Sequence, residues 1–95
     1  MKVTIHTILA IKRVVGQRQT EIELPDGTTV ADVLSYMVER WGDELSPHLF
    51  QPGTDVLIPH LRIMVNGQTI QYLNGTETVV HDGDEVLLLP LVSGG

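Results

Sequence analysis

The chain contains no cysteine among its 95 residues. Disulfide bonds, thiolate metal sites and a cysteine nucleophile are therefore excluded. Positive charge is also scarce, because six lysine and arginine residues stand against twelve aspartate and glutamate residues, for a net charge of −6. Nucleic-acid binding needs a basic patch, and the cations are scattered apart from the Lys12-Arg13 pair, so we expect no nucleic-acid partner. An acidic surface suits a basic protein partner, and it equally suits solubility alone.

Long hydrophobic runs are missing as well. No apolar stretch approaches the roughly 18–20 residues that span a bilayer, and the start of the chain lacks a signal-peptide pattern. We therefore expect a cytoplasmic protein with no membrane partner. The length is that of one domain, and we expect residues 1–95 to form it, with a flexible tail at residues 92–95.

The usual signatures of an enzyme are also absent. Asp82 and Asp84 flank Gly83 in a predicted tight turn, where solvated carboxylates are more common than a catalytic pair. No glycine-rich phosphate loop or nucleophile elbow is present. We therefore expect no independent enzyme activity, and no metal site, because neither ligand spacing nor a neighbouring cysteine accompanies the four histidines, His6, His48, His60 and His81.

The first half of the chain predicts a hairpin followed by a helix. Residues 1–8 and 20–24 alternate between apolar and polar side chains, as half-buried strands do, and we interpret residues 9–15 between them as a structured turn. Thr29 and Asp32 have the spacing of a capping box, and Gly42 suits a left-handed C-cap. One apolar stripe runs along the helix between them: Val30, Val33, Leu34, Met37, Val38 and Trp41.

The second half begins with a segment that has no clear periodicity. We expect a long loop over residues 43–60, with a short helical turn after Pro47. Residues 61–65 and 68–72 have the pattern of strands. They flank Asn66-Gly67, a dipeptide that favours a type I′ hairpin turn.

The last strand, from Val86 to about Leu89, is continuously hydrophobic, which is typical of a central strand. Pro90 cannot donate to a ladder, so pairing should end near Leu89 or Pro90 and release the tail at one end of the sheet. Because one helix can cover only one face of a sheet, the order of elements predicts an α+β fold.

The chain then reaches two glycines, Gly94 and Gly95. A tail without Cβ atoms can thread a narrow channel in extended conformations that other residues would resist. At the end of such a channel, an ATP-using partner can adenylate the carboxylate of Gly95, and the acyl adenylate can accept sulfur to give a thiocarboxylate. The alternative interpretation is an idle linker, which the adjoining core strand makes less attractive.

These features together resemble the ubiquitin-like β-grasp sulfur carriers of the MoaD/ThiS family. The resemblance covers essentially the whole chain and includes Val14-Val15-Gly16. Its most specific parts are the segments Val65-Asn66-Gly67, Leu73-Asn74-Gly75, Asp82-Gly83-Asp84-Glu85-Val86 and Leu89-Pro90-Leu91-Val92-Ser93-Gly94-Gly95.

The resemblance implies an α+β, ubiquitin-like β-grasp fold, with a mixed sheet of four to five strands and one main helix on one face. It implies a sulfur carrier, and the Pro90 tail is most similar to the small subunit of molybdopterin synthase, so we expect a role in molybdenum or tungsten cofactor synthesis. Leu88-Leu89 replace the usual aromatic residues, Leu91 replaces a common second proline, and the 43–60 loop is closer to carriers for cysteine synthesis. The alternatives are therefore a carrier for cysteine or thiamine synthesis, a protein modifier, and a β-grasp binding module.

The resemblance also implies partners. An adenylyltransferase of the ubiquitin-activating type would activate Gly95 with ATP and Mg²⁺, while the carrier itself would hold no permanent cofactor. The large subunit of molybdopterin synthase, or another acceptor enzyme, would then receive the sulfur. Leu87, Leu89 and Leu91 are docking candidates on the face that the helix leaves open, with core burial as the alternative. The full set of expected partner contacts is Leu87, Leu89, Pro90, Leu91, Val92 and Ser93.

Overall fold

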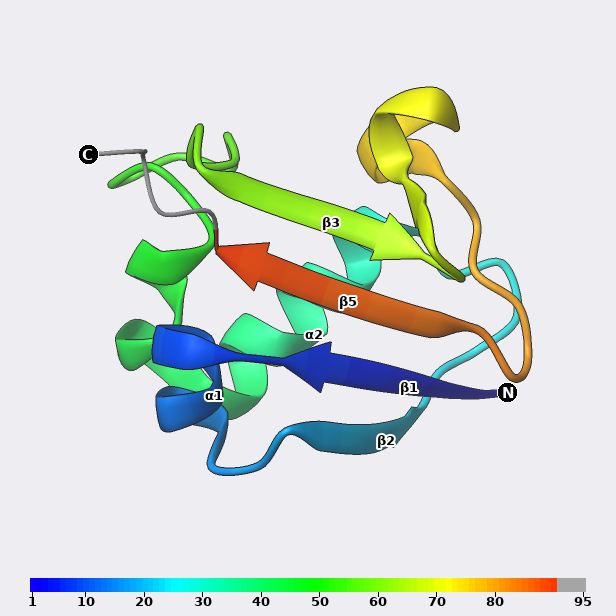
Figure 1. Cartoon of the computed structure of the whole chain (residues 1–95), viewed down its shortest axis with the longest axis horizontal. Coiled ribbons are helices and arrows are strands. Elements are labelled where there is room, and N and C mark those ends of the chain that lie inside the picture. Colours follow the sequence, from blue (N-terminus) through cyan, green and yellow to red (C-terminus); the bar gives the residue numbers. More distant parts are fainter. Residues whose placement is uncertain (91–95) are drawn as a thin grey trace.

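Five strands form one mixed sheet in the order β2-β1-β5-β3-β4 in the computed structural model, which describes residues 1–90 (Figure 1). The last strand, β5, lies at the centre, as the sequence predicts. It is parallel to β1 and antiparallel to β3. The strands are β1 (Lys2–Thr7), β2 (Gln19–Glu23), β3 (Leu61–Val65), β4 (Gln68–Thr69) and β5 (Glu85–Pro90).

Two helices accompany the sheet, α1 (Leu9–Val15) and α2 (Val30–Trp41). The longer helix, α2, crosses one face of the sheet (Figure 1), and its apolar stripe joins the inward side chains of the strands in one core. This arrangement confirms the predicted α+β, β-grasp fold. Four 3₁₀ turns complete the described chain: η1 (Gly42–Glu44), η2 (Ser46–His48), η3 (Ile70–Tyr72) and η4 (Gly75–Glu77).

Alternation along the strands separates the two faces of the sheet. Val3 and Ile5 of β1 are buried beneath α2, whereas Lys2 is exposed and His6 is half-buried on the other side. Successive side chains of a strand point to opposite faces, so the burial of alternate residues defines a core face and a face that α2 leaves open. We call the second one the open face.

The N-terminus of α2 has the predicted capping box. The backbone N–H of Asp32 donates to Thr29 Oγ1 at 3.2 Å, and the backbone N–H of Thr29 donates to Asp32 Oδ2 at 3.0 Å. Gly42 follows the helix with φ 70° and ψ −151°. The positive φ favours glycine, but this is not the left-handed C-cap that we expected, because the chain continues directly into η1.

Replacing Thr29 by alanine should destabilise the protein by about 1 kcal/mol, because the change leaves the amide of Asp32 without its acceptor at the start of α2. Chemical denaturation would measure the difference in unfolding free energy. Ser35→Ala is the matched control, since Ser35 is exposed on the same helix, and its effect should stay within about 0.5 kcal/mol. Equal effects of the two changes would contradict the capping role.

Three local predictions are wrong or incomplete. Residues 9–15 form helix α1 rather than a turn, because Ile11 and Val15 lie one helical turn apart and both are buried in the core. The 43–60 segment is more ordered than a long loop, since Leu45 and Leu49 are fully buried beside the turns η1 and η2.

The third correction concerns the strand expected over residues 68–72. Only Gln68 and Thr69 pair with β3, and the chain then turns into η3, which places Ile70 in the core. The hairpin turn itself is confirmed, because Asn66 and Gly67 have φ values of 50° and 84°. A type I′ turn requires positive φ at both central residues.

Candidate functional site

The strands β1 and β5 end at the same end of the sheet. They are parallel and in register, with Thr7 opposite Leu88, and the last residue of β5, Pro90, lies opposite Leu61 of β3. Pro90 is thus still paired with β3, and the predicted end of pairing lies at the limit of the described residues. The remaining predicted site residues, Leu91, Val92, Ser93, Gly94 and Gly95, lie outside the described residues, as does the expected flexible tail.

The side chains of β5 divide between the two faces of the sheet. Val86 and Leu88 are fully buried in the core, whereas Leu87 and Leu89 are half-buried on the open face, and Pro90 is half-buried at the strand end. The structure thus places both described docking leucines on the face where the sequence analysis expected docking. Their contact with a partner stays a prediction.

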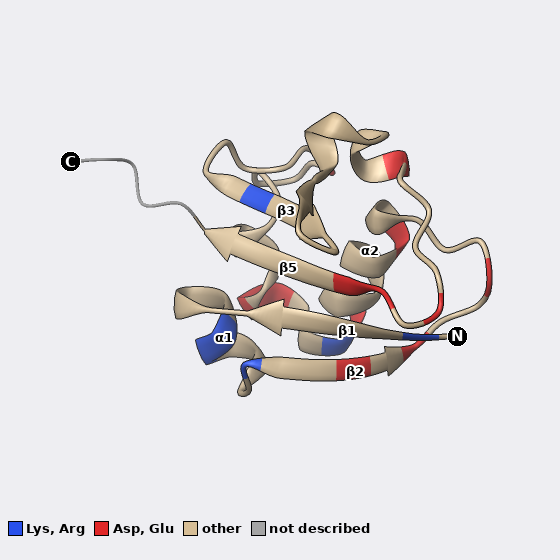
Figure 2. Ribbon diagram, turned by 45° about the vertical axis from the view of Figure 1, so that its right-hand side comes forward, with Lys and Arg blue, Asp and Glu red and all other residues tan. Residues whose placement is uncertain are grey.

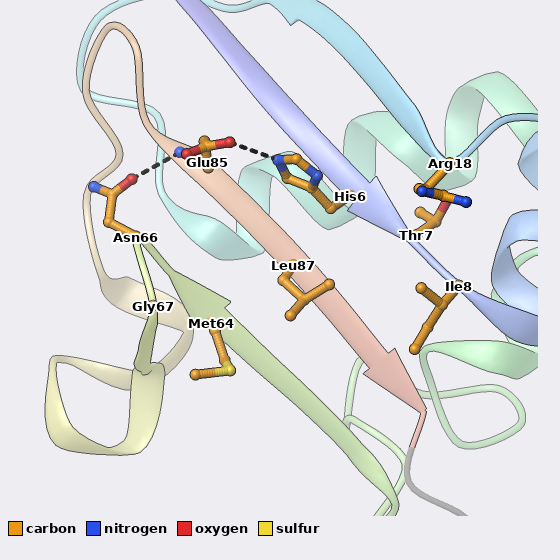
Figure 3. A pocket seen from close by; sticks show the side chains of 9 residues that line it. All are labelled: His6, Thr7, Ile8, Arg18, Met64, Asn66, Gly67, Glu85 and Leu87. Carbon is orange, nitrogen blue, oxygen red and sulfur yellow. Dashed lines mark hydrogen bonds and ion pairs between the residues drawn. The ribbon is translucent and has the colours of Figure 1, made fainter.

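Leu87 lies in a row of side chains that crosses the open face. The strand register sets His6 of β1 beside Leu87, Leu87 beside Met64 of β3, and Met64 beside Thr69 of β4. Around this row is a hollow of about 470 Å³, which we call the open-face hollow (Figure 3). Its lining residues are His6, Thr7, Ile8, Arg18, Met64, Asn66, Gly67, Glu85 and Leu87.

The open-face hollow is mainly apolar in its middle. Figure 3 shows Leu87 on β5 between Met64 on β3 and Ile8 just after β1, with the side chain of Arg18 beyond Thr7. An apolar floor with a polar rim is the usual anatomy of a protein interface. The open-face hollow therefore has the composition needed to receive an apolar side chain of a partner.

A hydrogen-bond network fixes the other end of the open-face hollow. His6 Nε2 and Glu85 Oε1 are 2.8 Å apart, which joins β1 to β5. The backbone N–H of Glu85 donates to Asn66 Oδ1 at 2.9 Å, and Asn66 Nδ2 donates to Asp84 Oδ1 at 2.9 Å. These bonds tie the β3–β4 turn to the start of β5, so the rim is held by groups far apart in the sequence.

Asn66→Ala should destabilise the protein by about 2 kcal/mol, because alanine loses both hydrogen bonds and resists the φ of 50° at this position. Asn66→Gly loses the same bonds but accepts the positive φ, so its cost should be about 1 kcal/mol lower. Urea unfolding of both variants would separate the two contributions. Equal losses of stability in the two variants would show that the positive φ of residue 66 imposes no cost on alanine.

Sequence reasoning missed most of the open-face hollow. His6, Ile8, Arg18 and Met64 come from three separate segments, and only the strand register brings them beside Leu87. One signal was available, because His6 and Met64 occupy the outward positions of predicted strands. The pairing order β1-β5-β3, which the sequence did not supply in full, was needed to join them.

The next two features of the described part of the chain concern a cluster of metal ligands and a membrane-spanning helix. No group of three or more histidine, cysteine, aspartate or glutamate side chains among residues 1–90 could hold a metal ion. In the same part of the chain, no helix has the length and apolar character needed to cross a membrane.

Comparison with known proteins relates this fold and surface to one family. The sequence profile of the ThiS family matches residues 7–95. Small archaeal modifier protein 3 of Haloferax volcanii is 32% identical over 95 residues, which cover 100% of both chains. A protein of Archaeoglobus fulgidus described as "Putative sulfur carrier protein" is 35% identical over 81 residues, or 85% of this chain and 89% of that protein.

Solved structures have the same fold. The solution structure of small archaeal modifier protein 1 from Methanosarcina acetivorans has a TM-score of 0.85 and 28% identity, and covers 99% of this chain and 96% of that chain. The BexX/CysO complex of Amycolatopsis orientalis has a TM-score of 0.76 and 26% identity over 98% of this chain and 99% of that chain. A "Putative molybdopterin converting factor, subunit 1" of Pyrococcus furiosus also has a TM-score of 0.76 and 26% identity, covering 97% and 99%.

Proposed function

The chain belongs to the ThiS family, and on that premise we propose that it is a sulfur carrier whose Gly95 carboxylate is converted to a thiocarboxylate. Its fold and sequence are those of a small ubiquitin-like protein of the sulfur-carrier and modifier type. The observation that carries the proposal is the place of β5. The central strand of the sheet, β5, reaches Pro90 at one end of the sheet, and the sequence leads from there to Gly94 and Gly95.

The chemistry requires a partner that uses ATP and Mg²⁺. A carboxylate oxygen of Gly95 attacks the α-phosphorus of ATP, which releases pyrophosphate and leaves an acyl adenylate. A sulfur nucleophile then attacks the acyl carbon, and AMP departs with the original carboxylate oxygen. This chain supplies the carboxylate and a surface for docking, and it has no cysteine that could intercept the adenylate.

The open-face hollow is the proposed docking surface for the adenylyltransferase. Leu87 and Leu89 present half-buried apolar side chains on the open face. The same strand leads directly, in the sequence, to the residues that precede Gly94 and Gly95. An adenylyltransferase bound at the open-face hollow would contact the sheet while its active-site channel receives Gly94 and Gly95. Leu87 is the central contact of this proposal, because it lies between the two strands that line the hollow.

We further propose a precursor of molybdopterin as the sulfur acceptor, reached through the large subunit of molybdopterin synthase. The tail sequence and the likeness to the Pyrococcus furiosus protein support this acceptor. The CysO likeness has the same identity of 26%, so cysteine synthesis is the second candidate. Incubating the thiocarboxylate form with the large subunit and pterin precursor, or with a cysteine-synthesis enzyme and its substrate, would distinguish them by which mixture consumes the thiocarboxylate.

A protein modifier is the competing function. The match to small archaeal modifier protein 3 along both whole chains favours it. In a modifier, the amino group of a target lysine rather than sulfur would displace AMP from the acyl adenylate. Affinity purification of a tagged copy from cells, followed by mass spectrometry, would show lysine conjugates for a modifier and only the thiocarboxylate for a dedicated carrier.

The experiment that tests sulfur carriage directly is the intact mass of the chain after incubation with its adenylyltransferase, ATP, Mg²⁺ and a sulfide source. We expect a mass increase equal to the difference between one sulfur and one oxygen atom. A folded chain that binds the adenylyltransferase but never gains this mass would overturn the proposal.

A further inference from the structure

We propose that Lys12, Arg13 and Arg18, here called the basic corner, form a second docking surface that pairs with an acidic surface on the adenylating partner. The inference rests on the proposed function, and it adds a contact that extends from Arg18, at the rim of the open-face hollow, to α1. It begins from the distribution of charge. The chain has a net charge of −6 and only six lysine and arginine residues, yet three of the six occupy one corner of the fold.

Figure 2 shows this corner as basic segments on α1 and at the start of β2, whereas the acidic segments of β2 and β5 lie toward the opposite end of these strands. Lys12 and Arg13 are exposed on α1, and Arg18 is exposed in the connection to β2. None of the three has an ion-pair partner within residues 1–90. Of the other three cations, Lys2 lies 3.7 Å from Glu21 and Arg40 lies over the ring of Trp41, whereas Arg62 also has no ion pair among residues 1–90. The basic corner therefore differs in the clustering of its cations rather than in their lack of ion pairs.

Local structure explains this cluster only in part. Lys12 and Arg13 lie in the last turn of α1, where positive charge interacts favourably with the helix dipole. Arg18 lies beyond the helix and gains nothing from that effect. Three unpaired cations of an acidic protein on adjoining elements therefore point to a charge-complementary partner.

An exposed apolar residue lies among these cations. Leu9 is 54% exposed and has a φ of 54°, a left-handed conformation that is costly for a bulky side chain. Together with Lys12, Arg13 and Gly16, it lines a hollow of about 460 Å³. An exposed leucine rimmed by positive charge has the composition of an interface for an apolar and acidic surface.

The basic corner adjoins the proposed docking surface and the start of the tail. Arg18 lines the open-face hollow together with Ile8, the residue that precedes Leu9. The parallel register of β1 and β5 brings Leu88 opposite Thr7, and α1 contacts β5. A partner that reaches the chain beyond Pro90 therefore passes this corner, which is why we assign it to the adenylating protein.

The test compares two double variants with equal net charge. Lys12→Ala/Arg13→Ala removes two cations of the basic corner, and Lys2→Ala/Arg40→Ala removes two cations elsewhere, from β1 and α2. Alanine favours helix formation, so α1 should persist, and melting temperatures would confirm that both variants fold. Affinity for the adenylyltransferase of the source organism is measured without ATP, so that binding is judged apart from sulfur transfer.

We expect the corner variant to bind about fivefold more weakly than the wild type at about 0.1 M salt. The difference should disappear at about 1 M salt, where charges are screened beyond about 3 Å, and the control variant should bind like the wild type. An equal loss in both variants, a loss that does not depend on salt, or an absence of binding by the wild type would each overturn the inference. A wild type that binds but gains no sulfur would overturn the proposed function instead.

Discussion

Deleting Gly95 is expected to abolish formation of the thiocarboxylate, with no mass increase after incubation with the adenylyltransferase, ATP, Mg²⁺ and sulfide. The deletion moves the carboxylate one residue back along the chain, so the carboxylate no longer reaches the α-phosphorus of ATP in the partner's site. Reactions of this kind depend on placing the reacting atoms about 3–3.5 Å apart. The effect should therefore be a loss of reaction rather than a modest slowing.

Gly95→Ala provides the companion test. It retains the length of the tail but adds a Cβ atom that a narrow channel would exclude. We therefore expect formation of the thiocarboxylate to be lost here as well. The folded domain is the internal control, because the fold described over residues 1–90 does not include Gly95. Both variants should have the melting temperature of the wild type, and sulfur gained by either of them would contradict Gly95 as the acceptor of AMP.

The second large effect is expected from alanine substitutions at two neighbouring leucines of β5, one of which should mainly reduce stability and the other mainly reduce partner binding. Leu88 is fully buried, so Leu88→Ala should destabilise the protein by about 3 kcal/mol. This is a large fraction of the roughly 5–15 kcal/mol that stabilises a typical domain. Leu87 is half-buried on the open face, so Leu87→Ala should cost only about 1 kcal/mol.

Binding should show the reverse order. Leu87→Ala should weaken binding to the adenylyltransferase about tenfold, the size expected for a central interface contact, whereas Leu88→Ala should bind like the wild type at a temperature where it is still folded. Thermal unfolding and titration calorimetry on the same samples would give both quantities. If Leu87→Ala bound normally, docking would have to occur elsewhere than the open-face hollow.

The sequence predicted those parts of the fold that depend on local patterns. The apolar stripe of α2, the capping box at Thr29 and Asp32 and the positive φ values at Asn66-Gly67 each follow from a few neighbouring residues. The unbroken apolar run of β5 also indicated a central strand, because side chains of the strands on both edges shield even its open-face residues, and Leu87 and Leu89 are half-buried. These features need no knowledge of distant contacts.

The rest required tertiary structure. Helix α1 was missed because Lys12-Arg13 interrupts a short apolar segment, although Ile11 and Val15 have helical spacing. Ile70 begins the turn η3 instead of continuing the expected strand, and its side chain is buried in the core. The open-face hollow was only partly predictable, because Leu87 could be named from β5 alone, while its neighbours Met64 and His6 depend on pairing across the sheet.

The pairing of β1 with β5 has a consequence for how the molecule is made. It joins the two ends of the described chain, as the contact between His6 and Glu85 across 79 sequence positions illustrates. Contacts of such large sequence separation form slowly, because closure of the intervening loop precedes any gain in energy. The sheet cannot be completed until β5 has left the ribosome, because β5 follows the other four strands in the sequence. A chain that stops before β5 lacks the strand that pairs with both β1 and β3, so we expect it to be far less stable than the chain with the complete sheet.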